Sequence, residues 1–259
     1  MIYFQIPEHF QKGNAVIAAK DNTGKILWSW HIWLTDQPAE QVYANNAGVM
    51  MDRNLGATSA TPGDVGALGL LYQWGRKDPF LGSSSISANT VAASTLTWPS
   101  AVSSSSSTGT IAYSIANPTK FIYGNSNSDE DWLYSSRNNE LWSTYKSIYD
   151  PCPAGWRVPD GGGNGIWSKA GFDDAAYDSI NRGIVFAYPI STPDAWFPAA
   201  GDLSYSYSSL ENVGTFGFYW SAANDSGAYG MSFESNGGVD PSSSFRSRAR
   251  GNSVRCLKE

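Results

Sequence analysis

Two cysteines, Cys152 and Cys256, constrain the fold of this chain more than any other feature. A disulfide between them would close a loop of 104 residues, which by loop-closure entropy is worth roughly 4–5 kcal/mol. An even cysteine count in a chain rich in Ser, Gly and aromatic residues favours an oxidising compartment, and hence the disulfide. Two buried free thiols are the alternative. Zinc is not expected, because His9 and His31 are far from both cysteines in the sequence.

The composition excludes some partners. Charged residues make up 15% of the 259 residues and hydrophobic residues 41%, against roughly 25% charged in an average soluble protein. The net charge of −6 and the lack of a basic stripe argue against nucleic acid. The only cationic cluster is a group of arginines near the C-terminus: Arg246, Arg248, Arg250 and Arg255. No apolar run approaches the ~20 residues that span a bilayer, so direct membrane insertion is not expected.

Residues 1–36 are predicted to form an N-terminal β segment. The alternating run IYFQIP, the run GNAVIAAKD and the run ILWSWHIWLTD read as strands, with a hairpin turn at Asn22-Thr23-Gly24. The segment is either the remnant of a preceding β-sandwich domain or the first strands of the domain that follows. No signal peptide is visible, so if the protein is exported we expect that residue 1 is not its native start.

Residues 37–259 are predicted to form one domain. Helical spacing of apolar residues suggests a short helix around 70–74, and a second helix is predicted at 173–182. Residues 83–118 are Ser-rich and are expected to be a surface insertion. Short strands separated by dense turn residues continue to Glu259, so we expect a small sheet with much irregular loop.

Three ordered motifs then suggest a family. They are DPCPAGWRVP at 150–159, YWS at 219–221 and SVRC at 253–256. Together they resemble the Fibrobacter succinogenes major paralogous domain. The upstream runs GNAVIAAKD, ILWSWHIWLTD, DRNLGA and GLLYQWGRKDPF resemble segments that precede this domain in Bacteroides fimbrillin-like surface proteins. The resemblance implies an α+β fold of the C-type-lectin-like, or formylglycine-generating-enzyme-like, type, with small antiparallel sheets, few helices and long loops.

The sequence departs from that family after Pro159. It continues DGGGNGIW over 160–167, where many relatives open a helix, so we expect the first helix to begin late, near Trp167. The resemblance also implies that certain residues are scaffold rather than ligand contacts: the two cysteines, Trp156, Trp220 and Arg255. Val254 and Leu257 are expected to face the core.

Residues 219–256 resemble the variable region of proteins diversified by retroelements. Apolar anchors (Trp220, Met231, Phe233 and Val254) alternate there with many Ser, Asn and Gly residues. The alternative is an ordinary Gly/Ser-rich loop. Residues between Ala222 and Asn252 are expected to face solvent except at the strand anchors.

Ligand contacts are predicted among the polar and aromatic residues of this region, because that mixture resembles an antibody paratope. Phe245 is the strongest single candidate, since it lies beside Arg246 in a Ser-rich loop with no obvious core role. The full predicted set is Ala223, Asn224, Asp225, Tyr229, Ser232, Ser235, Asn236, Asp240, Ser242, Ser244, Phe245 and Arg246.

Enzyme activity is not expected. A formylglycine-generating-type oxidase needs a reactive cysteine pair in a cleft, but both cysteines occupy scaffold positions of the motif. Both histidines are N-terminal and no Gly-x-Ser-x-Gly elbow occurs. The acidic run 129–131 is interpreted as a solvated turn rather than a carboxylate pair. Calcium could involve Asn224-Asp225 or Asp173-Asp174 but is not expected to be required, and no cofactor is predicted.

The predicted function is therefore non-enzymatic ligand binding at the extracellular cell surface, as an adhesin or pilus tip diversified by a retroelement. The ligand is an unknown protein or glycan, and pilus subunits are possible partners. Two alternatives stay open. One is a structural or assembly subunit of a pilus, in which the Trp-rich N-terminal strand docks on partners. The other is a phage receptor-binding protein of the same fold.

Overall fold

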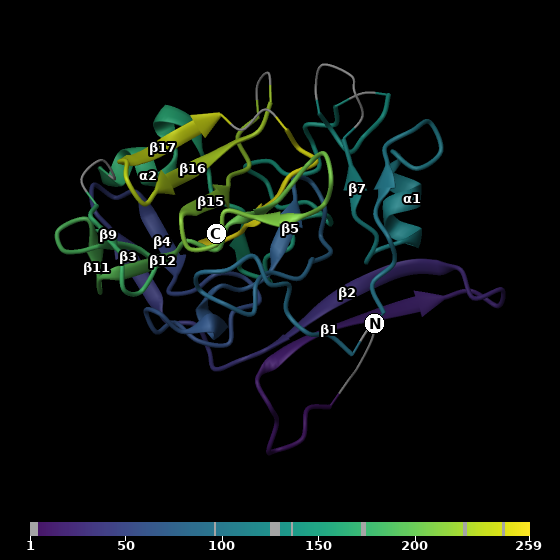
Figure 1. Cartoon of the computed structure of the whole chain (residues 1–259), viewed down its shortest axis with the longest axis horizontal. Coiled ribbons are helices and arrows are strands. Elements are labelled where there is room, and N and C mark those ends of the chain that lie inside the picture. Colours follow the sequence, from purple (N-terminus) through teal and green to yellow (C-terminus); the bar gives the residue numbers. More distant parts are fainter. Residues whose placement is uncertain are drawn as a thin grey trace.

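The computed structural model describes residues 5–95, 97–124, 130–135, 137–171, 175–224, 227–244 and 247–259. It consists mostly of small antiparallel and mixed sheets with few helices, which agrees with an α+β or a mostly-β fold (Figure 1). The two α-helices in the described chain are short: α1 (Ile111–Ala116) and α2 (Ile166–Ala170). Two single turns of 3-10 helix cover Val65–Ala67 and Gly162–Asn164.

The N-terminal segment folds into a separate two-stranded hairpin, β1 (Gly13–Lys20) and β2 (Ile26–Leu34). It crosses one side of the molecule (Figure 1). The predicted turn is present, with Gly24 at φ 87°. Alternation places Ser29 and His31 toward the domain, where Ser29 donates to Asp78 and the His31 ring bonds to the Tyr72 hydroxyl. The hairpin is thus tied to the domain by buried polar contacts.

A five-stranded sheet brings the chain end back to the start of the domain. Its order is β11-β3-β4-β19-β8, with bounds β3 (Glu40–Tyr43), β4 (Gly48–Met51), β8 (Trp156–Arg157), β11 (Ser191–Thr192) and β19 (Leu257–Lys258). The final strand β19 pairs antiparallel with both β4 and β8. Residues from three distant parts of the chain therefore meet in one sheet.

A larger seven-stranded sheet carries most of the C-terminal region. Its order is β14-β13-β18-β15-β16-β17, with β5 added to β18. The bounds are β5 (Leu71–Gln73), β13 (Asp202–Leu203), β14 (Leu210–Glu211), β15 (Phe216–Trp220), β16 (Tyr229–Glu234), β17 (Val239–Ser244) and β18 (Gly251–Ser253). Two smaller sheets complete the fold: β9 (Tyr177–Asp178), β10 (Gly183–Phe186) and β12 (Ala195–Pro198); and β6 (Val102–Ser103) with β7 (Ile122–Tyr123).

Aromatic residues dominate the core. One cluster of buried side chains contains Trp74, Trp132, Trp142 and Trp220, each at most 1% exposed, and lies around the cysteines. A second cluster packs under the C-terminal sheet and includes Phe186, Phe197, Tyr219, Met231 and Phe233. Gly217 makes this packing possible, because a Cβ there would lie 2.2 Å from the Phe233 ring. The anchors Met231, Phe233 and Val254 are buried, as is Leu257.

Three predicted elements differ from the structure. The helix around 70–74 is wrong: Leu71–Gln73 form strand β5, all three residues of which are buried. The helix at 173–182 is wrong over 175–182, which holds β9 and a turn, while 173 and 174 lie outside the described residues. The strand predicted for IYFQIP is not formed over residues 5–7, which are exposed and irregular; residues 2–4 are not described.

Helix α2 begins at Ile166, next to the late start expected near Trp167. The Ser-rich stretch 83–118, expected as a loop, is mostly irregular but contributes β6 and α1. Thr110 caps that helix, since its hydroxyl accepts a hydrogen bond from the Tyr113 amide at 3.0 Å.

Candidate functional site: the C-terminal sheet

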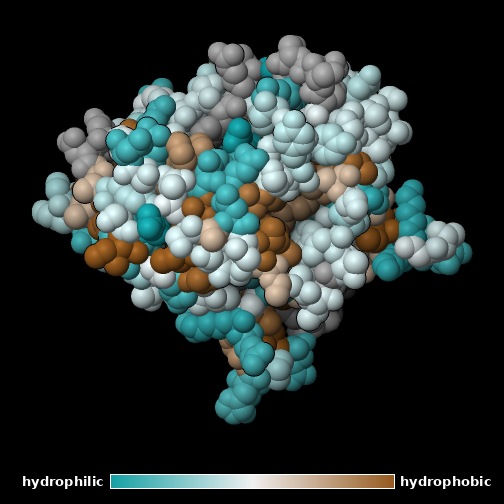
Figure 2. Space-filling view, viewed as in Figure 1, coloured by the Kyte–Doolittle hydropathy of each residue, from teal (hydrophilic) through white to brown (hydrophobic). Residues whose placement is uncertain are grey.

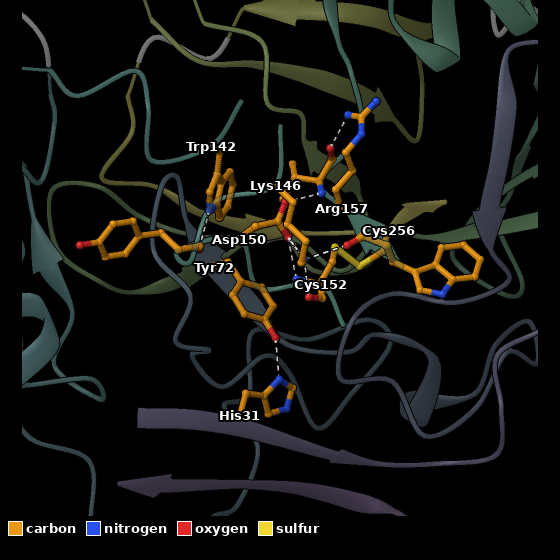
Figure 3. Close-up of a disulfide and its surroundings, with 11 residues drawn as sticks. His31, Tyr72, Trp142, Lys146, Asp150, Cys152, Arg157 and Cys256 are labelled. Atoms are coloured by element: carbon orange, nitrogen blue, oxygen red, sulfur yellow. Dashed lines mark hydrogen bonds and ion pairs between the residues drawn. A yellow bond between two sulfur atoms is a disulfide. The ribbon is translucent and has the colours of Figure 1, made fainter. Parts of the chain in front are cut away.

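The expected disulfide is present between Cys152 and Cys256 (Figure 3). Asp150 organises the chain on one side of it: its carboxylate accepts from the amides of Cys152 and Val158 and pairs with Lys146 at 3.1 Å. Burial raises the pKa of Asp150, and the Lys146 ammonium opposes that rise. The Asp150 carboxylate fixes the conformation of residues 150–158, and the disulfide attaches this segment to the C-terminal end of the chain at Cys256.

Arg255 is 1% exposed and lies inside the fold rather than at its surface. Its guanidinium donates to the Asn54 side-chain oxygen and to the Trp196 carbonyl, and stacks 3.7 Å from the Phe197 ring centre. Burial lowers the pKa of Arg255, while the neighbouring Tyr219 raises it. Its contacts are those of a residue that holds strands together, so it has no access to a ligand.

Trp220 and Trp74 lock the centre of the large sheet. The Trp220 indole donates to the Tyr72 carbonyl at 2.7 Å, and the Trp74 indole donates to the Ser221 carbonyl at 2.9 Å. Each indole N–H therefore has a hydrogen-bond partner within the buried core. Trp156, in β8, is also buried at 8% exposure.

The stretch from Ala222 to Asn252 is less exposed than predicted, because Ser247–Ala249 and Asn252 are buried. Arg248 is the physical reason: its guanidinium lies 4.1 Å from the Trp74 ring centre and donates to the Asn139 side chain. Asp131, predicted in a solvated turn, is 3% exposed and lies 4.0 Å from Arg248. The buried Arg248 guanidinium and the nearby Asp131 carboxylate thus hold residues 247–249 inside the fold.

The predicted ligand contacts fall into two groups. Asp225, Phe245 and Arg246 lie outside the described residues. The other nine are half-buried or exposed, and none is buried: Ala223, Asn224, Tyr229, Ser232, Ser235, Asn236, Asp240, Ser242 and Ser244. Most of these lie on the β16–β17 hairpin, which the sequence had suggested to be largely loop.

The strand register shows that these residues do not share one face. Ser232 pairs with Asp240, and Tyr229 pairs with Ser244. Cross-strand partners lie on the same side of a sheet, and residues three apart on one strand lie on opposite sides. The Ser232–Asp240 pair therefore faces outward, whereas the Tyr229–Ser244 pair is on the side of the buried Met231. An irregularity in β17 near Pro241 allows both pairs to form.

The outward side of β15 adds two aromatic residues that were not predicted. Phe216 and Phe218 are half-buried and stack in parallel, with ring centres 5.5 Å apart and planes 6° apart. Phe218 pairs with Ser232 and Phe216 with Glu234. We call this group the outer sheet face: Phe216, Phe218, Ser232, Glu234 and Asp240. The two-residue period of a strand, applied to the run FGFYW, was the signal that would have placed Phe216 and Phe218 on one face.

Arg250 borders the outer sheet face. Its guanidinium lies 5.7 Å from the Phe218 ring centre and 5.6 Å from that of Tyr205. It forms an ion pair with Asp202, whose pKa is raised by burial and lowered again by Arg250. In the view of Figure 2, hydrophobic and hydrophilic residues are intermixed across the molecule rather than gathered into one broad apolar patch. Stacked rings, hydroxyls and charges thus lie within one small area.

No three His, Cys, Asp or Glu side chains among the described residues are grouped so as to hold a metal ion. His31 lies in the hairpin, where burial lowers its pKa to about 4, so it is neutral near pH 7. Within the described chain no helix has the length and apolar character needed to cross a membrane.

Comparison with known proteins gives no relative. No protein-family model, no curated protein and no solved structure matches the chain.

Proposed function

We propose that this protein is a non-enzymatic ligand-binding protein with a C-type-lectin-like fold, exported and displayed at the bacterial cell surface. In this proposal the C-terminal sheet is the binding platform, and the ligand is a protein or a glycan. The disulfide fits an oxidising environment. The pairing of the last strand, β19, with β4 and β8 fits a fold in which the beginning and the end of a loop-rich domain are joined in one sheet.

The outer sheet face is the observation that carries the proposal. It combines two stacked, partly exposed rings with a serine, two carboxylates and a neighbouring guanidinium. Partly exposed aromatic pairs supply contact area at low conformational cost, and Ser and Asp supply hydrogen bonds at the rim. Because Tyr219, Met231 and Phe233 hold the strands from the opposite, buried side, the outward residues can change without loss of that cluster.

Binding to glycan and protein arrays tests this proposal. Wild-type protein is compared with Phe218→Ala, and Tyr188→Ala serves as the matched control because Tyr188 is an exposed ring (79%) outside the outer sheet face. Loss of a central aromatic contact costs about 2 kcal/mol, so we expect the Kd of the strongest array hit to rise about 30-fold in Phe218→Ala. Equal binding by both variants would remove the outer sheet face as the site.

Diversification by a retroelement is the finer part of the proposal. The division of residues 219–256 into buried anchors and outward polar positions supports it. Sequencing the gene from several strains is the test. We expect differences to cluster after Tyr219, at outward positions such as Ser232 and Asp240, while Trp220 and Arg255 stay constant. Differences spread evenly along the chain would contradict this part alone.

A further inference from the structure

Strand β2 has one free edge. Among the described residues, it belongs to a two-stranded sheet whose other strand is β1. Within the described part of the chain, no backbone hydrogen bond joins β2 to a strand or loop other than β1. In an antiparallel pair, alternate N–H and C=O groups of each strand point away from the partner. Main-chain donors and acceptors on this side of the nine-residue strand therefore have no backbone partner among the described residues, although helix α1 contacts part of the strand.

A groove of about 650 Å³ runs beside this edge. Its lining includes the consecutive residues 28–31 of β2. Side chains alternate between the two faces of a strand, so consecutive residues can line one groove only where it follows the strand edge. The lining also includes Ile148 and residues 150–153 next to the disulfide. Figure 3 shows β2 below this region, with His31 directed from it toward Tyr72.

The walls of the groove are largely apolar, and the charges on them are compensated. Lys77 bonds to both oxygens of Asp78 and lies 4.5 Å from the Trp28 ring centre. Asp150 is held by Lys146 and two amides. The described lining thus offers no unpaired charge to a ligand, while Ile148 at its rim is 70% exposed. Complementarity therefore favours an uncharged occupant.

We propose that this groove binds an extended peptide segment of another protein, with uncharged apolar side chains, which adds as a third strand to the free edge of β2. The groove volume lies in the range of specific ligand sites. An unused row of alternating backbone donors and acceptors is complementary to an extended polypeptide and gives a sugar ring no comparable match. This inference is independent of the outer sheet face, which is a different surface of the molecule.

Selection of peptides provides the first test. A phage-displayed library of linear 12-residue peptides is panned against the intact wild-type protein, and enriched peptides are synthesised. Ile148→Asp is expected to weaken their binding at least 10-fold. Ile180→Asp is the matched control, since Ile180 is 81% exposed on the turn between β9 and β10, and we expect it to have no effect. Failure to enrich any peptide, or equal binding by the two variants, overturns the proposal.

The pairing mode provides the second test. Single N-methyl groups are placed at successive positions of the best peptide. An added strand donates only every second amide N–H to its neighbour. Methylation at either the odd or the even positions should therefore abolish binding, and methylation at the other set should change the Kd by no more than about threefold. Tolerance at both parities overturns strand addition. A glycan that displaces the peptide from the groove would identify a sugar as the occupant instead. A dimer of the wild-type protein in sedimentation, dissociated by Ile148→Asp, would identify a second copy of the chain as the occupant.

Discussion

The disulfide between Cys152 and Cys256 makes a quantitative prediction. It closes a loop of 104 residues in the native chain, and the loop-entropy relation gives about 4.7 kcal/mol for a loop of this size. At an unfolding entropy of about 2.1 cal/mol/K per residue, a chain of 259 residues should lose about 9 °C of Tm when the bond is removed. The double variant Cys152→Ala/Cys256→Ala is the perturbation.

Calorimetry of wild-type protein and of the double variant, each with and without reductant, is the assay. We expect reductant to lower the wild-type Tm by about 9 °C and to leave the double variant unchanged. Thiols that alkylate without reductant would refute the bond itself. A fall in Tm of less than about 2 °C would refute the reasoning that the disulfide stabilises the loop-rich C-terminal half by closing the loop. The loop-closure entropy would then be compensated elsewhere.

Three further predictions rest on single residues. Gly217→Ala should lower the free energy of unfolding, measured in urea, by about 1–3 kcal/mol, because its Cβ would lie 2.2 Å from the Phe233 ring. The control Gly238→Ala, whose Cβ would have no atom within 4 Å, should change that free energy by less than about 0.5 kcal/mol. Equal effects of the two variants would contradict the packing. Arg255→Met leaves the Asn54 oxygen without its donor and should cost about 3 kcal/mol by the same assay; a loss below about 1 kcal/mol would argue against the buried scaffold role. Burial lowers the pKa of His31 to about 4, below its unfolded value of about 6.5. The contribution of neutral His31 to the free energy of unfolding should therefore be fully present above pH ~6.5 and be lost as the pH falls toward 4. His31→Gln should flatten this pH dependence of the melting temperature, and an unchanged slope would contradict the assignment.

Strand positions were predicted from the sequence where one face of the strand is buried and the other is not. The run ILWSWHIWL alternates and became β2, and the apolar runs that contain Trp220 and Met231 became β15 and β16. Strand β5 was missed because Leu71–Gln73 are buried on both sides, which removes the alternation that separates a strand from a helix.

The candidate site was predicted in part, for a physical reason. Composition identifies a polar, aromatic region, but strand register decides which of its residues share a face, and register depends on partners far away in the sequence. Ser232 and Asp240 are brought together by the β16–β17 pairing, and Phe218 joins them only through β15. Arg248 looked like part of a surface cluster, yet its partners, Trp74 and Asn139, come from other segments.

Hydrogen–deuterium exchange with and without the strongest array hit tests the central claim most directly. The account predicts slower exchange of the amides of β15 and of the β16–β17 hairpin on binding, with exchange in β2 unchanged. Protection confined to β2, or to the sheet β9-β10-β12, with none on the C-terminal sheet, would contradict it.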